Sequence, residues 1–79
     1  MISSPVNGLD LRGTPCPLNY VRCRLALEQL FPNDTLEVFL DKGEPEEMVT
    51  SGLQSDGHNV EVVQKDSAWV KIMVICGAK

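Results

Sequence analysis

The chain has 79 residues, of which 43% are hydrophobic and 23% are charged, and its formal net charge at pH 7 is −4. This length predicts a single domain over residues 1–79, whose core buries only about 60% of the surface of the unfolded chain and leaves little room for a deep substrate cavity. The acidic excess argues against direct binding to nucleic acid, because phosphate contacts need clustered lysine and arginine.

The longest apolar run, residues 72–76, is far too short to cross a bilayer. The first five residues contain neither the basic nor the apolar part of a signal peptide. Three cysteines are an odd number and too few for a disulfide scaffold, which fits a reducing compartment. We therefore expect a cytoplasmic protein that does not contact membranes.

Hydrophobic periodicity and turn signals predict six elements along the chain. In order, these are a strand over 8–11, a helix over 17–30, a strand over 35–40, a helix from 45 that closes at 56–57, and two hairpin strands over 58–64 and 68–75. The order β-α-β-α-β-β predicts an α/β (α+β) two-layer sandwich. Its two helices are expected on one face of a four-stranded mixed sheet.

The core is predicted from residues that share one face of each element. On the first helix this stripe comprises Tyr20, Cys23, Leu27 and Leu30; on the strands it comprises Leu36, Val38, Leu40, Val60, Val62, Val70, Ile72 and Val74. Phe39, Trp69 and Met73 fall on the opposite face of the sheet. Those three side chains form either a docking surface or the scattered apolar surface that is normal for soluble proteins.

Cys16 is the candidate nucleophile, because it lies between Pro15 and Pro17 where the first strand gives way to the first helix. Pro17 suits the first helical position, which places Cys16 at the N-cap. The unpaired N–H groups and the dipole of a helix start favour a thiolate. Thiols in such places have pKa values of roughly 3.5 to 7.5, against ~8.5 for a free cysteine, whereas the alternative for Cys16 is a small buried hydrophobe.

Neither of the other cysteines is expected to act with Cys16. Cys23 lies seven residues along the same helix, ~10 Å away, and a disulfide needs Cα atoms within ~7 Å. Cys76 follows the last strand and is expected to be an exposed, unused thiol. His58 is the only histidine and is expected to be a hydrogen-bonded strand residue, so no Cys–His pair is predicted. A Cys₃His zinc site built from the three cysteines and His58 would lack any close pair of ligands, and we expect neither a metal nor a cofactor.

The segment 9–17, LDLRGTPCP, resembles the TusA/SirA/YedF family of small sulfur-carrier proteins. The helix that ends near Leu30 and the strands around 34–38 and 57–60 extend this resemblance from about residue 9 to about residue 75. It implies a two-layer α/β sandwich, and a cysteine, here Cys16, that accepts a sulfane sulfur as a persulfide and passes it to a partner protein. In the family such relays serve tRNA thiolation, molybdenum cofactor supply or sulfur oxidation. The implied partners are a donor, such as a cysteine desulfurase or a rhodanese-like protein, and an acceptor protein.

The chain departs from the family motif Cys-Pro-x-Pro at its fourth position, which is Asn19. Asn19 restores a backbone N–H and adds an amide close to the sulfur. A proline there is expected to cost little, because the first turn of a helix has no intrahelical partners for its N–H groups. Arg12 is the other supporting residue: it either stabilises the charge on the sulfur or pairs with a carboxylate such as Asp10 or Glu44.

A second apolar stripe on the first helix consists of Leu18, Val21 and Leu25. It either packs against the second helix or, at its Cys16 end, contacts a partner. With Arg22 beside it, this surface would suit an acidic partner, and we expect the protein to be a monomer. The alternative function is a non-catalytic adaptor or regulator that keeps the fold but not sulfur transfer, a reading that the missing second proline leaves open.

Overall fold

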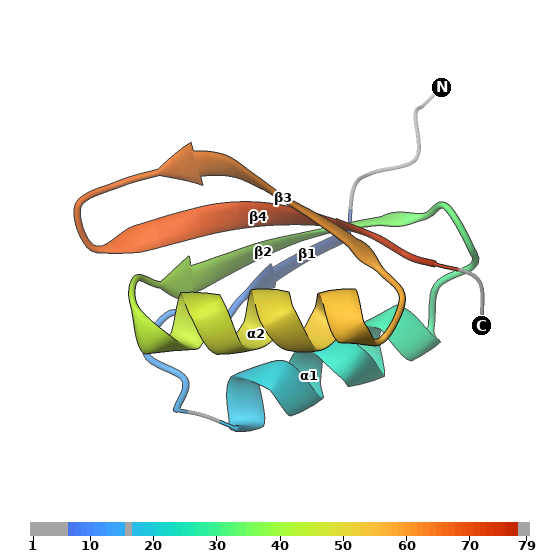
Figure 1. Cartoon of the computed structure of the whole chain (residues 1–79), viewed down its shortest axis with the longest axis horizontal. Coiled ribbons are helices and arrows are strands. Elements are labelled where there is room, and N and C mark those ends of the chain that lie inside the picture. The colour runs from blue at the N-terminus through green and yellow to red at the C-terminus, as the bar shows by residue number, and fades with distance from the viewer. Residues whose placement is uncertain (1–6, 16, 78–79) are drawn as a thin grey trace.

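The computed structural model describes residues 7–15 and 17–77. Figure 1 shows two helices lying side by side over one face of a sheet. In chain order the elements are β1 (Asn7–Asp10), α1 (Leu18–Glu28), β2 (Thr35–Asp41), α2 (Glu44–Ser55), β3 (Asn59–Lys65) and β4 (Trp69–Ile75). This two-layer arrangement confirms the predicted fold class.

The sheet is mixed, with strand order β1-β2-β4-β3. Strand β1 runs parallel to β2, and β4 is antiparallel to both β2 and β3. Parallel neighbours need a crossover connection, which α1 provides. The carboxyl ends of β1 and β2 therefore lie at the same end of the sheet, on the left in Figure 1. The segment that leads to Cys16 consequently starts beside the loop between β2 and α2.

The core lies between the helices and the two central strands. Leu36, Val38 and Leu40 of β2 alternate with half-buried residues and pair in register with Val74, Ile72 and Val70 of β4. All six of these side chains are at most 2% exposed. The helices contribute Cys23, Leu27, Val49 and Leu53 to the same cluster. The predicted core face of the central strands is therefore confirmed.

Helix α1 is shorter than predicted at both ends. Pro17 is the N-cap rather than the first helical residue, because its ψ of 11° with φ of −91° is not helical. At the other end, the N–H groups of Gln29 and Leu30 donate to carbonyl oxygens three residues back, at 3.1 and 3.0 Å. This tighter turn ends the α-helix at Glu28.

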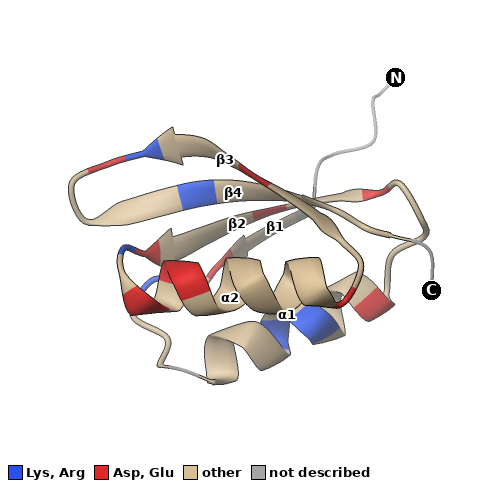
Figure 2. Cartoon of the chain, in the orientation of Figure 1, with Lys and Arg blue, Asp and Glu red and all other residues tan. Residues whose placement is uncertain are grey.

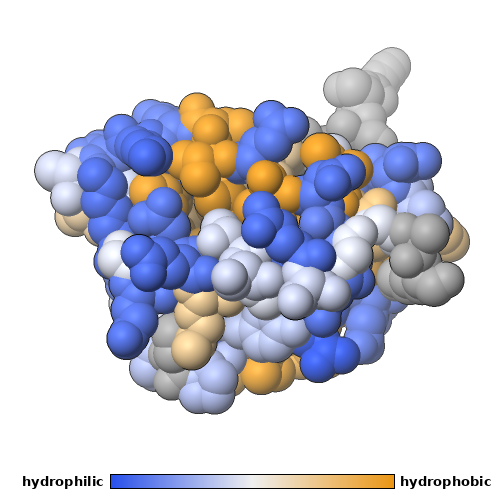
Figure 3. Space-filling view, viewed as in Figure 1, coloured by the Kyte–Doolittle hydropathy of each residue, from blue (hydrophilic) through white to orange (hydrophobic). Residues whose placement is uncertain are grey.

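Strand β3 forms one edge of the sheet. Val60 and Val62 pair with Val74 and Ile72, so they share the helix-facing side as predicted. Val62 is nevertheless 41% exposed, and Val63, at a register irregularity, is 47% exposed. The core face of the sheet thus ends near Val60, and apolar side chains remain visible over this edge in Figure 3.

The two helices contact each other through Tyr20 of α1. A Cβ atom added to Gly52 of α2 would lie 2.6 Å from the tyrosine ring, so the ring packs directly on that glycine. The Tyr20 hydroxyl donates to Asp56 Oδ2, which raises the pKa of Tyr20. Arg24 lies over the same ring and near the same carboxylate. Tyr20 therefore makes the contact with α2 that was one of the two expectations for Leu18, Val21 and Leu25.

Within the described residues, no helix has the length and apolar character that a membrane span requires.

Candidate functional site: the turn and helix start around Cys16

Cys16, the predicted nucleophile, lies outside the described residues. The residues on both sides of it are described, and the site is described through them. The preceding segment, 11–15, leaves β1, and the following residues, 17–21, begin α1.

A tight turn connects β1 to this segment. The N–H of Thr14 donates to the carbonyl oxygen of Leu11 at 3.0 Å, and Gly13 has a φ of +80°. A positive φ at the third position of a four-residue turn is the reason that glycine is favoured there. Leu11 is 1% exposed, and its N–H donates to the carbonyl oxygen of Phe39 at 2.9 Å. The turn is therefore attached directly to β2.

Arg12 in this turn is paired with Asp10. Its Nε and Nη2 donate to Oδ1 and Oδ2 of Asp10 at 3.0 and 2.8 Å, and its backbone N–H donates to Oδ1 at 3.1 Å. These hydrogen bonds lower the pKa of Asp10 to about 2. The guanidinium also lies 5.1 Å from the ring centroid of Phe39 and 5.6 Å from that of Trp69. Of the two carboxylates considered for Arg12, the structure thus selects Asp10 rather than Glu44.

The outer face of the sheet carries an aromatic pair, as the alternation predicted. The rings of Phe39 and Trp69 are 5.4 Å apart. Arg12 lies over both rings, and Lys71 lies over Phe39 while pairing with Glu37 at 3.5 Å. Charged side chains therefore accompany the aromatic rings on this face.

Asp41 is a residue of this site that sequence reasoning missed. Its Oδ2 accepts the N–H of Gly13 at 2.8 Å. Asp41 is the last residue of β2 and lies 28 positions from Gly13 in the chain. An aspartate at the end of a strand is typical of an ordinary loop. No local signal in the sequence could have linked it to Gly13.

The first turn of α1 uses Asn19 in two ways. The N–H of Asn19 donates to the carbonyl oxygen of Pro15 at 3.1 Å, and its Oδ1 accepts the N–H of Tyr20 at 2.7 Å. Asn19 is fully buried. The expectation that a proline here would cost little is therefore wrong, because proline lacks the N–H that bonds to Pro15 and the amide that accepts from Tyr20.

The other two cysteines are both buried. Cys23 is 0% exposed, and burial raises its pKa to about 12. Cys76 is 1% exposed, so the prediction of an exposed thiol is wrong. Its N–H donates to the carbonyl oxygen of Asp34 and its carbonyl oxygen accepts the N–H of Asn33, both at 2.8 Å. These two bonds hold the segment after β4 against the turn before β2 and keep the thiol in the core.

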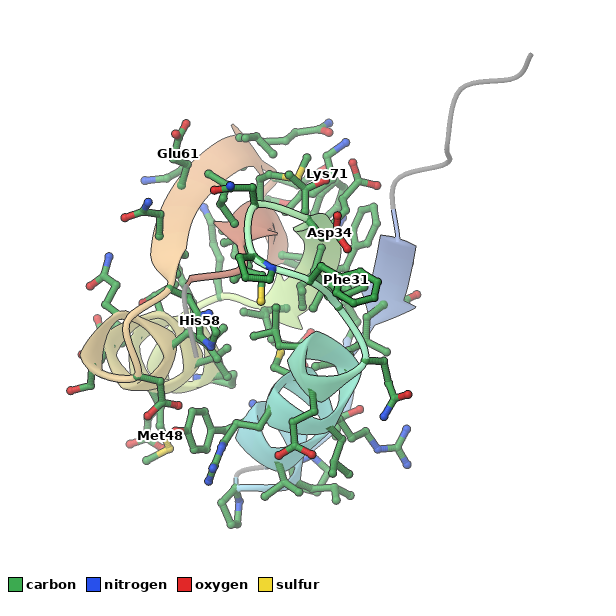
Figure 4. All side chains as sticks on the ribbon, turned by 90° about the vertical axis from the view of Figure 1, so that its right-hand side faces the viewer. Phe31, Asp34, Met48, His58, Glu61 and Lys71 are labelled. Carbon is green, nitrogen blue, oxygen red and sulfur yellow. The ribbon has the colours of Figure 1, made fainter. Side chains whose placement is uncertain are left out.

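His58 is hydrogen-bonded, as predicted. Its Nδ1 accepts the N–H of Gly77 at 2.9 Å. Figure 4 shows His58 between the end of α2 and the C-terminal segment, at the end of the sheet that carries Asp34 and Phe31. The described residues contain no group of three histidine, cysteine, aspartate or glutamate side chains that could hold a metal ion.

The second apolar stripe of α1 is on the surface. Leu18, Val21 and Leu25 are 43%, 42% and 56% exposed, so packing against α2 is wrong. Arg22 and Arg24 are exposed on the same helix, whereas the first turn of α2 is acidic, and Figure 2 shows this separation of charge. The surface beside the start of α1 is thus apolar with basic neighbours.

The architecture and this helix start place the chain among small α/β domains with a SirA-like fold. The crystal structure of a SirA-like protein from Desulfitobacterium hafniense superimposes with a TM-score of 0.76 over 89% of this chain and 96% of that one, at 21% sequence identity. The sequence model of the family described as Sulfurtransferase TusA matches residues 7–75. The chain therefore belongs to the TusA family.

Two relatives carry names that refer to sulfur transport. An inferred sulfur carrier protein of Archaeoglobus fulgidus is 32% identical over 57 residues, which cover 72% of this chain and 65% of that protein. An inferred sulfur carrier protein of Thermotoga maritima is also 32% identical over 57 residues, covering 72% of each chain. The aligned segment thus spans slightly less than two thirds of the Archaeoglobus protein.

Proposed function

We propose that this protein is a sulfur carrier that accepts a sulfane sulfur on Cys16 and passes it to a partner protein. Membership of the TusA family and the names of the two relatives support the carrier role. The observation that carries the assignment to Cys16 is the burial of both other thiols. Cys23 and Cys76 are at most 1% exposed, so neither of these thiols is accessible to a protein partner, which supports Cys16 as the acceptor.

The chemistry is a thiol–persulfide exchange that needs no cofactor. The Cys16 thiolate attacks the terminal sulfur of a persulfide on the donor; a new S–S bond forms, the donor's S–S bond breaks, and the donor cysteine leaves as a thiolate. Delivery to the acceptor repeats this exchange with Cys16 as the leaving group. Each step conserves electrons, so no external oxidant or reductant takes part.

The start of α1 supports this chemistry electrostatically. The first N–H groups of a helix lack intrahelical partners and carry partial positive charge, which favours an anion. Here the N–H groups of Asn19 and Tyr20 are already bonded to Pro15 and to the Asn19 amide. The support for a thiolate therefore comes from the helix dipole and from the N–H of Leu18. Pro17 adds no donor, because proline lacks an N–H, and Asn19 stabilises the first turn through its hydrogen bonds with Pro15 and Tyr20.

Partners are expected to approach along α1. Leu18, Val21 and Leu25 offer exposed apolar area along α1, beginning at its first residue, and Arg22 adds positive charge. Because interfaces combine an apolar centre with a polar rim, an acidic rim on the partner suits this surface. We assign the donor to the class of cysteine desulfurases or rhodanese-like proteins. Thiolation of tRNA, molybdenum cofactor supply and other sulfur metabolism are the candidate destinations, with this chain acting as a cytoplasmic monomer.

Sulfur loading tests the proposal. The protein is incubated with a cysteine desulfurase and cysteine, and intact mass is measured; loading adds about 32 Da per sulfane sulfur. Cys16→Ser should remain folded, since it replaces one small side chain by another of similar size and leaves the Pro17 N-cap of α1 in place, and it should not gain the mass. Cys76→Ala is the matched control and should load like the wild type. A wild type that stays unmodified, while still binding the desulfurase, would favour the adaptor function instead.

A further inference from the structure

We propose that Asp41 is a positioning residue for the segment that carries Cys16, acting through its hydrogen bond to the backbone of Gly13. Its effect on sulfur transfer rests on the function proposed above. Its effect on the geometry of the segment and on the thiol can be measured independently.

The turn over residues 11–14 has two outward-pointing donors that the sheet itself cannot satisfy. The N–H of Arg12 donates to Asp10, two residues back in the same strand-turn unit. The N–H of Gly13 donates to Asp41 at 2.8 Å, across to the neighbouring strand. The bond to Asp41 therefore ties the backbone of the turn to a different element, in addition to the stacking of the Arg12 side chain on Phe39 and Trp69.

Asp41 lies at a well-anchored position at the end of the sheet. It is the last residue of β2, a central strand, and it pairs in register with Trp69 of β4. The next residue, Lys42, donates its N–H to the carbonyl oxygen of Ala68 at 3.1 Å. The strand pairing and this bond hold the end of β2 to the β3–β4 hairpin, so the Asp41 carboxylate projects from a well-anchored part of the fold.

The chemistry of the contact also favours a carboxylate. A hydrogen bond from a backbone N–H to an ionised acceptor is stronger than one between neutral groups. Asp41 also attracts the guanidinium of Arg12, whose pKa is raised chiefly by its hydrogen bonds to Asp10 and further by the charge of Asp41. Asp41 thus stabilises the turn at two consecutive residues, three and four positions before Cys16.

A comparison of two substitutions isolates the hydrogen bond from the charge. Asp41→Asn and Asp41→Ala both remove the negative charge, but asparagine keeps an oxygen that can accept from Gly13. At pH 7 we expect the Cys16 thiol to react with iodoacetamide about fivefold faster in Asp41→Asn than in Asp41→Ala, the factor that corresponds to one such hydrogen bond. Exchange of the Gly13 amide, followed by NMR, should be slow in the wild type and in Asp41→Asn and fast in Asp41→Ala.

Asp34→Ala provides the matched control. Asp34 Oδ2 likewise accepts a backbone N–H in a turn, that of Phe31 at 2.9 Å, but it precedes β2 and lies at the opposite end of that strand, roughly 20 Å from Asp41. This variant loses a similar bond and should leave the reactivity of Cys16 unchanged. A general loss of stability would affect both alanine variants alike, whereas positioning affects only Asp41→Ala.

The proposal is overturned if the two Asp41 variants react at the same rate, if the Gly13 amide of the wild type exchanges as fast as in an unfolded chain, or if Asp34→Ala changes Cys16 as much as Asp41→Ala does. Sulfur loading by a desulfurase is measured in parallel, and Asp41→Ala should load more slowly than Asp41→Asn. A wild type that does not load removes the proposed function, while alkylation and amide exchange still decide the role of Asp41.

Discussion

Selective alkylation of Cys16 in the folded protein is the prediction that most directly probes the three thiols. The perturbation is a short pulse of iodoacetamide at pH 7, which reacts with thiolates and not with thiols. The wild-type chain is suitable without substitutions, because peptide mapping distinguishes Cys16, Cys23 and Cys76.

The expected selectivity follows from the burial of the other two residues. Burial raises the pKa of Cys23 to about 12, so at pH 7 only about one Cys23 side chain in 10⁵ is a thiolate. A thiol with the ordinary pKa of ~8.5 is about 3% ionised at the same pH, which already favours Cys16 by a factor of about 3,000. Inaccessibility adds to this factor, since Cys23 is 0% and Cys76 is 1% exposed.

The assay follows the labelled fraction of each cysteine peptide with time and pH. Labelling of Cys16 should rise with pH and level off below pH 8.5, if the start of α1 stabilises its thiolate. Labelling of Cys23 and Cys76 should appear only under denaturing conditions. Comparable labelling of either residue in the folded protein would refute the reasoning, because it would mean that the core opens or that these thiols are not buried.

Three further predictions concern stability and charge. In an NMR titration the Asp10 carboxyl should have its midpoint near the pKa of about 2, below the ordinary 3.8, and Arg12→Ala should return it to the ordinary range. Because this pKa is lowered in the folded state, the pair stabilises the protein above about pH 4 and its contribution is lost as the pH falls toward 2; a stability contribution from the pair that grows on acidification would contradict the pairing. Leu27→Ala, at a site 1% exposed, should lower the free energy of unfolding by about 2–5 kcal/mol in a denaturant titration. Leu25→Ala, two residues away on the same helix and 56% exposed, should change it by less than about 0.5 kcal/mol, and equal effects would disprove the assigned faces of α1. Gly52→Ala should cost about 1–3 kcal/mol in the same measurement, because the new Cβ would lie 2.6 Å from the tyrosine ring of α1. A gain of about 1 kcal/mol, the usual preference of a helix for alanine over glycine, would show that the ring is free to move.

The helix start around Cys16 was predictable in outline and not in detail. Two prolines flanking a cysteine after a short strand are visible in the chain itself, and they located the start of α1 to within one residue. The role of Asn19 was not predictable. Whether an amide near a helix start faces solvent or core depends on which side of the first turn packs against the sheet, and here Asn19 is fully buried.

The outer face of the sheet was likewise predictable in part. Strict alternation along β2 and β4 placed Phe39 and Trp69 away from the core, because successive side chains of a strand point to opposite faces. The alternation could not show that Arg12 stacks over both rings, since that depends on the parallel pairing of β1 with β2 and on the antiparallel pairing of β2 with β4.

By itself, the sequence determined the order of the elements, the residues that form the core of the central strands, and the position at which the first helix begins, to within one residue. These are local properties, carried by periodicity, turn residues and the restricted backbone of proline. Tertiary structure alone decided that Cys76 is buried and that Asp41 reaches Gly13. Both contacts join residues far apart in the chain, Cys76 with Asp34 and Asp41 with Gly13. They exist because the parallel crossover brings the ends of β1 and β2 together and β4 lies beside β2, neither of which is written in any short stretch of sequence.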